Sequence, residues 1–277
     1  MTQGTSDTVV LIHGLWMTPL CWEHWIERYK GRGFQVLAPA WPGMDGDIAQ
    51  LRRDTSGIDR LTAHEIIDHY DSIIRALPAP PIIMGHSFGG LFTQVLLSHG
   101  LGAAGIAIDS APAKGILSLP LSTLRSAWPV LHNPANAHRA VALTPEQFHY
   151  AFTNTLTEEE SRPVYERYAI PGPGHVLFEG ALANINPHSA FAVDFNKSDR
   201  APLLFIAGGA DHVVPASSNR ANVKHYRKSK AITAYKEFAG RSHYTLGQDG
   251  WEAVADFALA WATNPTANVD GAGATGA

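Results

Sequence analysis

The sequence of 277 residues contains a single cysteine, Cys21, so it cannot form an internal disulfide bond. A low cysteine content is typical of proteins from a reducing compartment. Cys21 lies within an apolar helical pattern, which favours a small buried residue over a nucleophile. The sequence therefore predicts neither a disulfide scaffold nor thiol chemistry.

Long hydrophobic runs are also missing. No apolar run approaches the roughly 18 residues that a membrane-spanning helix needs. Residues 1–7 have neither the basic segment nor the apolar segment of a secretion signal. We therefore expect a cytoplasmic protein with no stable membrane insertion.

Neither sign of charge predominates in the sequence. The chain has 21 Lys and Arg against 25 Asp and Glu, a formal net charge of −4, and no basic stripe. Nucleic-acid-binding domains usually concentrate Lys and Arg on one face, so we expect a small-molecule substrate rather than a nucleic acid. The His and Asp spacings show no clear metal-ligand set, and we expect no metal and no cofactor.

Short apolar segments alternate with helical patterns along much of the chain. The helices begin at recognisable caps, such as Thr18-Pro19 and the capping box Thr62-x-x-Glu65. This alternation predicts right-handed βαβ units and a parallel sheet. Between the second strand and the Thr62 helix we expect a polar loop with Asp45 and Asp47. The predicted strands lie near residues 8–12, 34–38, 81–84, 104–108, 203–207 and 232–235.

The alternation breaks between about residues 115 and 198. This segment shows no clear strand, and capping boxes at Thr144 and Thr157 indicate helices. We predict a mostly helical insertion over the carboxyl edge of the sheet. The predicted organisation is a core of residues 1–114 and 199–263, a helical cap of residues 115–198, and a flexible tail of residues 264–277 that lacks large apolar side chains.

The stretch Gly85-His86-Ser87-Phe88-Gly89 lies between a predicted strand and a predicted helix. This is the G-x-S-x-G pattern of a nucleophile elbow, in which a strained turn exposes a serine hydroxyl. Glycines two places on either side are needed because side chains there would clash in so tight a turn. We therefore interpret Ser87 as a nucleophile; the alternative is a glycine-rich turn with an incidental serine.

Two further polar residues follow predicted strands, namely Asp211 and His243. In an open parallel sheet the carboxyl ends of the strands form the crevice where ligands bind, so these residues can meet Ser87 there. A serine hydroxyl needs an imidazole to take its proton, and the imidazole needs a carboxylate to orient it. Asp109 also ends a strand and is the rival acid. His243 is preferred over the other histidines because it precedes the closing helix.

The sequence resembles the α/β-hydrolase fold superfamily, in particular the helical-capped, esterase-like and lipase-like serine hydrolases. The matching motifs are HGLW at residues 13–16, GHSFGG at 85–90, GGADHVVP at 208–215 and RSHY at 241–244. The resemblance implies Ser87 as nucleophile, Asp211 as acid and His243 as base. It also implies an oxyanion hole from the backbone N–H groups of Leu15 and Phe88. His13 is expected to be structural. Because only about seven residues precede the first strand, we expect about six strands, with helices on both faces.

The predicted activity is hydrolysis of a carboxylic ester, lactone or thioester of a small, largely apolar substrate. C–C bond hydrolases, amidases, and cofactor-free perhydrolases or lyases share such a triad and stay open, as does a non-catalytic binding module. An interfacial lipase would need an exposed apolar lid, and the candidates Phe148, Phe152 and Leu156 are more simply core residues. From loop position we expect the pocket wall to include Trp16, Met44, Trp128, Phe148, Phe152 and Phe178.

Overall fold

The computed structural model describes residues 6–266 and contains a six-stranded parallel sheet in the order β2-β1-β3-β4-β7-β8. The central strands are buried on both faces, as expected of a parallel sheet covered by helices. The predicted sheet is confirmed. Its strands are β1 (Thr8–Ile12), β2 (Gln35–Leu37), β3 (Ile82–His86), β4 (Ala104–Ile108), β7 (Leu203–Gly208) and β8 (Thr233–Phe238).

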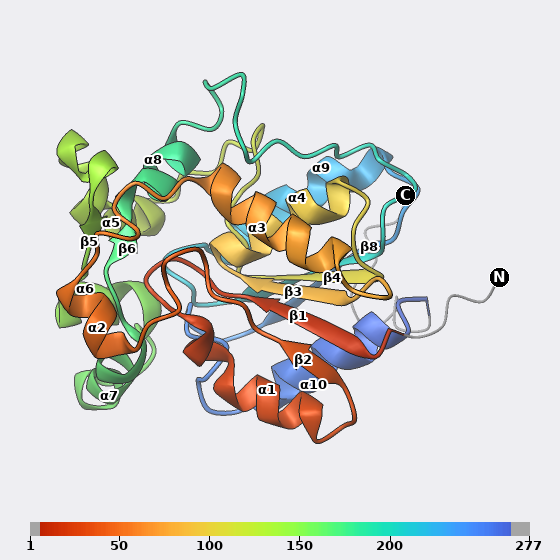
Figure 1. Cartoon of the computed structure of the whole chain (residues 1–277), viewed down its shortest axis with the longest axis horizontal. Helices are drawn as coiled ribbons and strands as arrows, with labels where there is room; N and C mark the ends of the chain where they lie inside the picture. Colours follow the sequence, from red (N-terminus) through yellow and green to blue (C-terminus); the bar gives the residue numbers. More distant parts are fainter. Residues whose placement is uncertain (1–5, 267–277) are drawn as a thin grey trace.

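Helices cover both faces of the sheet (Figure 1). One face carries α1 (Glu23–Lys30) and α10 (Trp251–Thr263), and the other carries α3 (Ala63–Arg75), α4 (Phe88–Ser98) and α9 (Ala216–His225). Short 3-10 helices lie at Pro19–Trp22, Pro134–His138 and Tyr226–Lys228. This layering is the expected α/β architecture.

The predicted helix starts agree with the observed caps. Thr18 caps the 3-10 helix before α1, and Thr62 forms a complete capping box with Glu65 at the start of α3. Thr144 and Thr157 form the two capping boxes expected within residues 115–198. These signals are reliable because a capping box is satisfied entirely within four consecutive residues.

Residues 115–198, which we call the cap, place their helices beyond the carboxyl ends of the strands, at the left of Figure 1. The segment after residue 181 then returns along the α4 side of the sheet, where Asp194 N–H donates to Ser98 Oγ at 2.9 Å. The cap contains α5 (Leu121–Leu131), α6 (Pro145–Phe152), α7 (Glu158–Tyr168) and α8 (Gly174–Ala181). A two-stranded antiparallel ribbon of β5 (Ala140–Val141) and β6 (Gly172–Pro173) joins them, where no strand was expected. The strands of this ribbon are two residues long, too short to leave a pattern in the sequence.

The expected polar loop around Asp45 and Asp47 is wrong in one respect, because it contains the helix α2 (Ile48–Arg53). Asp47 is its N-cap and accepts a 2.7 Å hydrogen bond from Gln50 N–H. Arg52 donates to the carbonyl oxygens of Tyr165, Glu166 and Ala169 at the end of α7. A six-residue helix is unstable on its own and depends on such tertiary contacts. The periodicity of so short a segment therefore did not indicate a helix.

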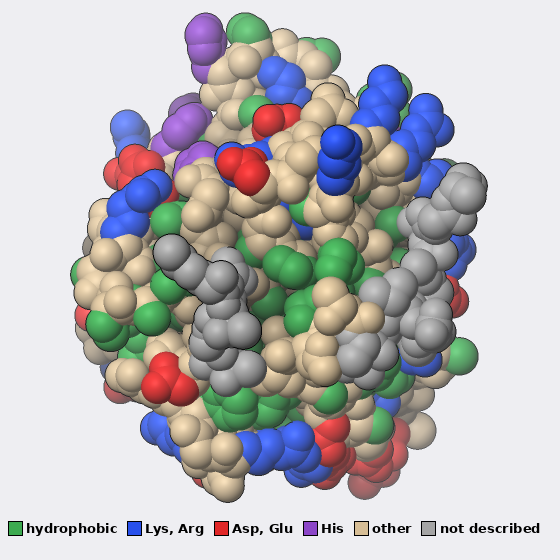
Figure 2. Space-filling model, turned by 90° about the vertical axis from the view of Figure 1, so that its right-hand side faces the viewer, with side chains coloured by type: hydrophobic (Ala, Val, Ile, Leu, Met, Phe, Trp, Pro, Cys, Tyr) green, Lys and Arg blue, Asp and Glu red, His purple; other side chains and the backbone are tan. Residues whose placement is uncertain are grey.

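The face opposite the cap is shown in Figure 2. In that view Lys and Arg are scattered around the margins rather than gathered in one stripe, in line with the mild net charge. Within residues 6–266 no helix is both long and apolar enough to cross a membrane. The predicted flexible tail falls mostly on residues 267–277, which lie outside the described residues, as do residues 1–5.

Candidate active site

Ser87 lies on a strained turn between β3 and α4. Its backbone has φ 58° and ψ −120°, and only two other non-glycine residues of the described range have positive φ. A Cβ atom on Gly85 would collide with the carbonyl group of Gly89, and one on Gly89 would collide with the carbonyl oxygen of Ile12. The glycines therefore allow the turn for the steric reason that the motif predicts.

The loop after β1 lies directly against Ser87. A Cβ atom added to Gly14 would be 2.7 Å from Ser87 Cβ. The backbone N–H groups of Leu15 and Phe88 donate no hydrogen bond to an acceptor within residues 6–266. Phe88 begins α4, so its N–H belongs to the first turn of that helix, which has no intrahelical acceptor. Free N–H groups beside a helix N-terminus are suited to bind a developing negative charge.

His243 and Asp211 form a buried hydrogen-bonded pair. The Nδ1–H of His243 donates to Asp211 Oδ2 at 2.7 Å. The other carboxylate oxygen of Asp211 accepts from the backbone N–H groups of Val213 and Val214, at 2.7 Å and 2.9 Å. The carboxylate is thereby held in place, and it fixes the proton of His243 on Nδ1. His243 Nε2 is buried and has no hydrogen-bond partner in the described chain.

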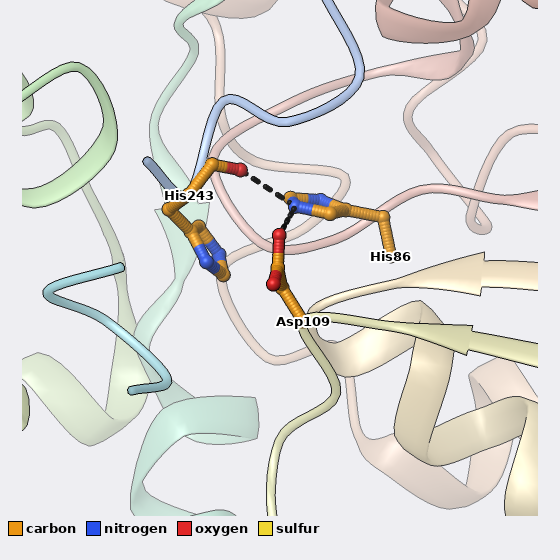
Figure 3. Close-up of side chains that lie close together, drawn as sticks. All are labelled: His86, Asp109 and His243. Carbon is orange, nitrogen blue, oxygen red and sulfur yellow. Dashed lines mark hydrogen bonds and ion pairs between the residues drawn. The ribbon is translucent and has the colours of Figure 1, made fainter. Parts of the chain in front are cut away.

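His86, the residue before Ser87, contacts His243. His86 Nε2–H donates to the carbonyl oxygen of His243 at 2.8 Å, and the two imidazole rings are 4.6 Å apart (Figure 3). No direct hydrogen bond joins Ser87 Oγ to His243 in the described residues. In ligand-free sites such bonds are often long and tighten when substrate binds.

Asp109, the rival acid, does not bond to the His243 imidazole. Its Oδ1 accepts from Gly208 N–H at 2.6 Å, and its Oδ2 lies 3.9 Å from His86 Nε2 (Figure 3). Complete burial raises the pKa of Asp109 well above its ordinary value, and the nearby charge of Asp211 raises it further. A raised pKa disfavours the charged carboxylate that would stabilise an imidazolium ion. In this geometry Asp211 is the better candidate.

His86, Asp109 and His243 also offer potential metal-ligand atoms within 4.8 Å of one another. His86 Nε2 donates to the carbonyl oxygen of His243, so this nitrogen carries a proton and cannot bind a cation in this arrangement. Its other ring nitrogen, Nδ1, is buried and has no hydrogen-bond partner in the described residues. Burial lowers the pKa of His86, in keeping with a neutral ring. The arrangement fits a hydrogen-bonded support for the His243 loop better than a metal centre.

The comparison with protein families covers nearly all of the described fold. The model of the alpha/beta hydrolase family matches residues 9–257. The chain belongs to the alpha/beta hydrolase family. No match was found among curated proteins. The resemblance inferred from the HGLW and GHSFGG motifs is thus confirmed at the level of the family.

Solved structures with the same fold cover almost the whole of this alpha/beta hydrolase family member. A monoacylglycerol lipase from Paleococcus ferrophilus is similar with a TM-score of 0.62 and 22% identity, over 94% of this chain and 96% of the lipase. A pyrethroid hydrolase from Sphingobium faniae has a TM-score of 0.67 and 19% identity, over 93% and 98%. An extracellular alpha/beta-hydrolase from a Paenibacillus species has a TM-score of 0.65 and 20% identity, over 92% and 97%. At these identities the likeness concerns the fold.

A cavity of about 130 Å³ reaches Ser87 between the sheet and the cap. Trp16 and Phe88 form part of its wall next to the serine. Beyond them the wall is mainly apolar and comes from α4, the loop after β4, the residues just before α5, α5 itself, α8 and the loop after Asp211. The residues that contribute are Leu91, Ala111, Pro112, Leu119, Leu124, Ala127, Leu131, Leu177, Ala181, Val213 and Val214.

Of the six expected wall residues, only Trp16 lines this cavity, and the expectation for the other five is corrected. Along α5, Leu124, Ala127 and Leu131 recur at helical spacing on the cavity side, which leaves Trp128 65% exposed. Phe148 and Phe152 are fully buried in a stacked pair instead. Met44 is buried in the hydrophobic core, and Phe178 is partly buried against that core. Neither side chain lines the cavity. Loop position did not reveal which face of each element points inward.

The cap also holds the three loops that carry the candidate residues, which sequence analysis missed. Trp16 Nε1–H donates to the carbonyl oxygen of Val141 at 3.0 Å, and Tyr244 N–H donates to that of Phe152 at 2.8 Å. Asn154 Nδ2–H donates to the carbonyl oxygen of Ala210 at 2.9 Å. All three bonds end on backbone carbonyl oxygens, which every residue type has, so the sequence could not indicate them.

Proposed function

We propose that this alpha/beta hydrolase is a serine hydrolase that cleaves a carboxylic ester, lactone or thioester of a small, largely apolar substrate. The observation that carries the proposal is the 2.7 Å hydrogen bond between His243 and Asp211, which leaves His243 Nε2 without a partner beside the strained Ser87 turn. Burying an imidazole nitrogen without a hydrogen-bond partner costs folding free energy, so such a group in a cleft is a candidate for a functional role. Proton transfer from a serine hydroxyl is such a role.

In the proposed mechanism Ser87 Oγ attacks the carbonyl carbon while His243 Nε2 takes the hydroxyl proton. Asp211 stabilises the imidazolium ion that results, because its carboxylate already accepts the Nδ1 proton. The N–H groups of Leu15 and Phe88 bind the oxyanion, each with an expected contribution of about 3 kcal/mol. When the tetrahedral intermediate collapses, the leaving alcohol takes the proton from Nε2. Water activated by His243 then releases the acid.

The cavity supports an apolar substrate. Its wall next to Ser87 consists mainly of Leu, Ala and Val side chains, with a few hydroxyl groups from α5 and α9. Two of these hydroxyls, on Thr123 and Ser126, already donate to the carbonyl oxygens of Val213 and His212. They are therefore engaged with the protein, and the free wall is suited to alkyl or aryl groups.

A fluorophosphonate probe tests the proposal, because it modifies only an activated serine. We expect labelling of the intact chain and none of Ser87→Ala. Ser72→Ala, at an exposed serine on α3, is the matched control and should label normally. Turnover of p-nitrophenyl esters of varied acyl length, with lactones, amides and aryl diketones in parallel, distinguishes an esterase from the other activities of such triads. Full turnover by Ser87→Ala would refute the mechanism, and an unlabelled parent protein would favour a binding module.

A further inference from the structure

The exposed large hydrophobic side chains of the described residues are confined to two segments of the cap. Leu117, Leu121 and Ile185 are 84%, 85% and 79% exposed. Apolar side chains of this size are normally buried, and an exposed cluster of them indicates an interaction surface. We call the set the apolar rim; it consists of Leu117, Leu119, Leu121, Leu124, Trp128, Leu182 and Ile185.

The two segments of the rim are joined. Gly115 N–H donates to Asn184 Oδ1 at 2.6 Å, and Asn184 Nδ2–H donates to the carbonyl oxygen of Ile116 at 3.2 Å. The helices α5 and α8 also pack against each other, as Figure 1 shows at the left. The rim is therefore one surface of the cap rather than two separate patches.

The rim is apolar and carries little charge. Arg125, between the rim residues Leu124 and Trp128, is exposed, and its guanidinium stacks over the Tyr150 ring at 3.8 Å. Residues 115–124 and residues 180–193 contain no Lys, Arg, Asp or Glu. A surface that recognised anionic lipid headgroups or a charged protein would carry complementary charges. The chemistry of the rim therefore fits an uncharged partner.

The rim borders the Ser87 cavity where the cavity meets the surface. Leu119 and Leu124 are exposed members of the rim and also line the cavity. Leu117, Leu121 and Ile185 belong to the rim but do not line the cavity. A single small substrate molecule inside the cavity would leave these outer side chains in water, so only a larger apolar body can cover them.

The position of the rim distinguishes between its possible binding partners. A second copy of this chain, or another protein, seated on the rim would cover the entrance to the cavity and obstruct access to Ser87. An aggregate of ester molecules would cover the same side chains and supply substrate at the entrance. Transfer of these leucine side chains from water into such an aggregate is favourable because it buries apolar surface.

We propose that the apolar rim is a docking surface for aggregated neutral esters, such as micelles or droplets, and that sparingly soluble uncharged esters are the substrate class. The substrate part of this proposal rests on the proposed function, whereas docking does not. The rim, rather than the Phe148 and Phe152 pair considered from the sequence, is the exposed apolar element of the cap.

Binding is tested with droplets of tributyrin, an uncharged triester, on the Ser87→Ala protein, so that no turnover is required. The rim variant Leu117→Ser/Leu121→Ser/Ile185→Ser removes exposed side chains that do not line the cavity. We expect Ser87→Ala to sediment or float with the droplets, and the added rim substitutions to weaken binding at least about tenfold. Raising the salt concentration about tenfold should leave binding unchanged or stronger, since the side chains proposed to dock carry no charge.

The matched control carries three serine substitutions at exposed positions away from the cap, Glu27→Ser/Asp68→Ser/Lys224→Ser, and should bind as the parent does. Circular dichroism and thermal melting establish that each variant is folded. Failure of the parent to bind droplets, or equal binding by the rim variant, would overturn the docking proposal whatever the outcome of the fluorophosphonate test. A dimer that forms without ester and dissociates in the rim variant, seen by sedimentation, would overturn it in favour of a second copy.

Turnover provides the second readout. With Ser87 intact, the tributyrin hydrolysis rate should rise steeply once the ester exceeds its solubility limit. The rim variant should match the parent below that limit and lose the rise above it. A rise of equal size in both proteins would contradict the assignment of aggregated esters as the substrate class.

Discussion

The carbonyl oxygen of Phe152, at the end of cap helix α6, accepts a 2.8 Å hydrogen bond from the backbone N–H of Tyr244, the residue after His243. The Phe152 ring also lies edge-on to the His243 imidazole, with 5.0 Å between ring centroids. The cap thus contacts the candidate base through both backbone and side chain. In this region the cap is part of the support of the site as well as a cover for it.

We expect Phe152→Leu to lower kcat by about 10² with a smaller change in KM, because the ring that limits the orientation of His243 is lost. The matched control is Phe148→Leu. Phe148 is equally buried and stacks on Phe152 at 4.7 Å, but the Phe148 ring makes no ring contact with His243. Both variants should lose similar thermal stability, and only Phe152→Leu should react slowly with fluorophosphonate. Equal kcat losses in the two would indicate a packing role alone.

Asp211→Asn should reduce kcat by about 10⁴, because an amide cannot both hold the Nδ1 proton of His243 and stabilise the imidazolium ion. Asp109→Asn should retain most of its kcat, since Asp109 Oδ1 bonds to the backbone of Gly208 rather than to His243. Steady-state kinetics on one accepted ester compares the two variants directly. The reverse ranking would make Asp109 the acid.

Asp109→Asn should also stabilise the fold, and more so at high pH. The folded-state pKa of Asp109 is raised, so above about pH 4 the unfolded chain loses this proton more readily than the folded chain does. Stability is therefore lost as pH rises from the unfolded pKa towards the folded pKa, by about 1.4 kcal/mol per pH unit between them. Asparagine can still accept from Gly208 N–H. Urea unfolding should show little difference near pH 4 and a more stable variant at pH 8, and a pH-independent difference would exclude this linkage.

His13 should make the protein sensitive to acid. Its Nδ1–H donates to Gly14 O at 3.0 Å, and its Nε2 accepts from Trp41 N–H at 3.2 Å, so the ring is held neutral. Burial lowers the pKa of His13 from 6.5 to about 4. Because the unfolded chain binds this proton first, stability contributed by neutral His13 is present above pH 6.5 and declines by about 3 kcal/mol as the pH falls to 4.

The variant His13→Gln keeps an acceptor for Trp41 N–H without a group that titrates. It should be less stable than the parent at pH 8 and should show a smaller loss between pH 7 and pH 4. Urea unfolding at several pH values measures both. Parallel stability curves for the two proteins would show that His13 does not control the acid response.

The parts of this protein that the sequence determined are those specified by neighbouring residues. The turn at Ser87 depends on glycines two positions away, and the capping boxes at Thr62, Thr144 and Thr157 close within four residues. The apolar strands need burial on both faces and so predict a covered parallel sheet. These local requirements yield the fold and the set of candidate residues without knowledge of distant contacts.

Features that depend on contacts between residues far apart in the chain became visible only in the tertiary structure. Both Asp109 and Asp211 end strands, and the 2.7 Å contact to His243 distinguishes Asp211 from its rival. The rotation of α5 places Leu124 in the cavity wall and Trp128 in water, because packing against the rest of the cap, rather than hydrophobicity, sets which face points inward. The sequence thus specifies the candidate nucleophile and the candidate acids and base, while long-range packing favours Asp211 over Asp109 and shapes the cavity beside Ser87.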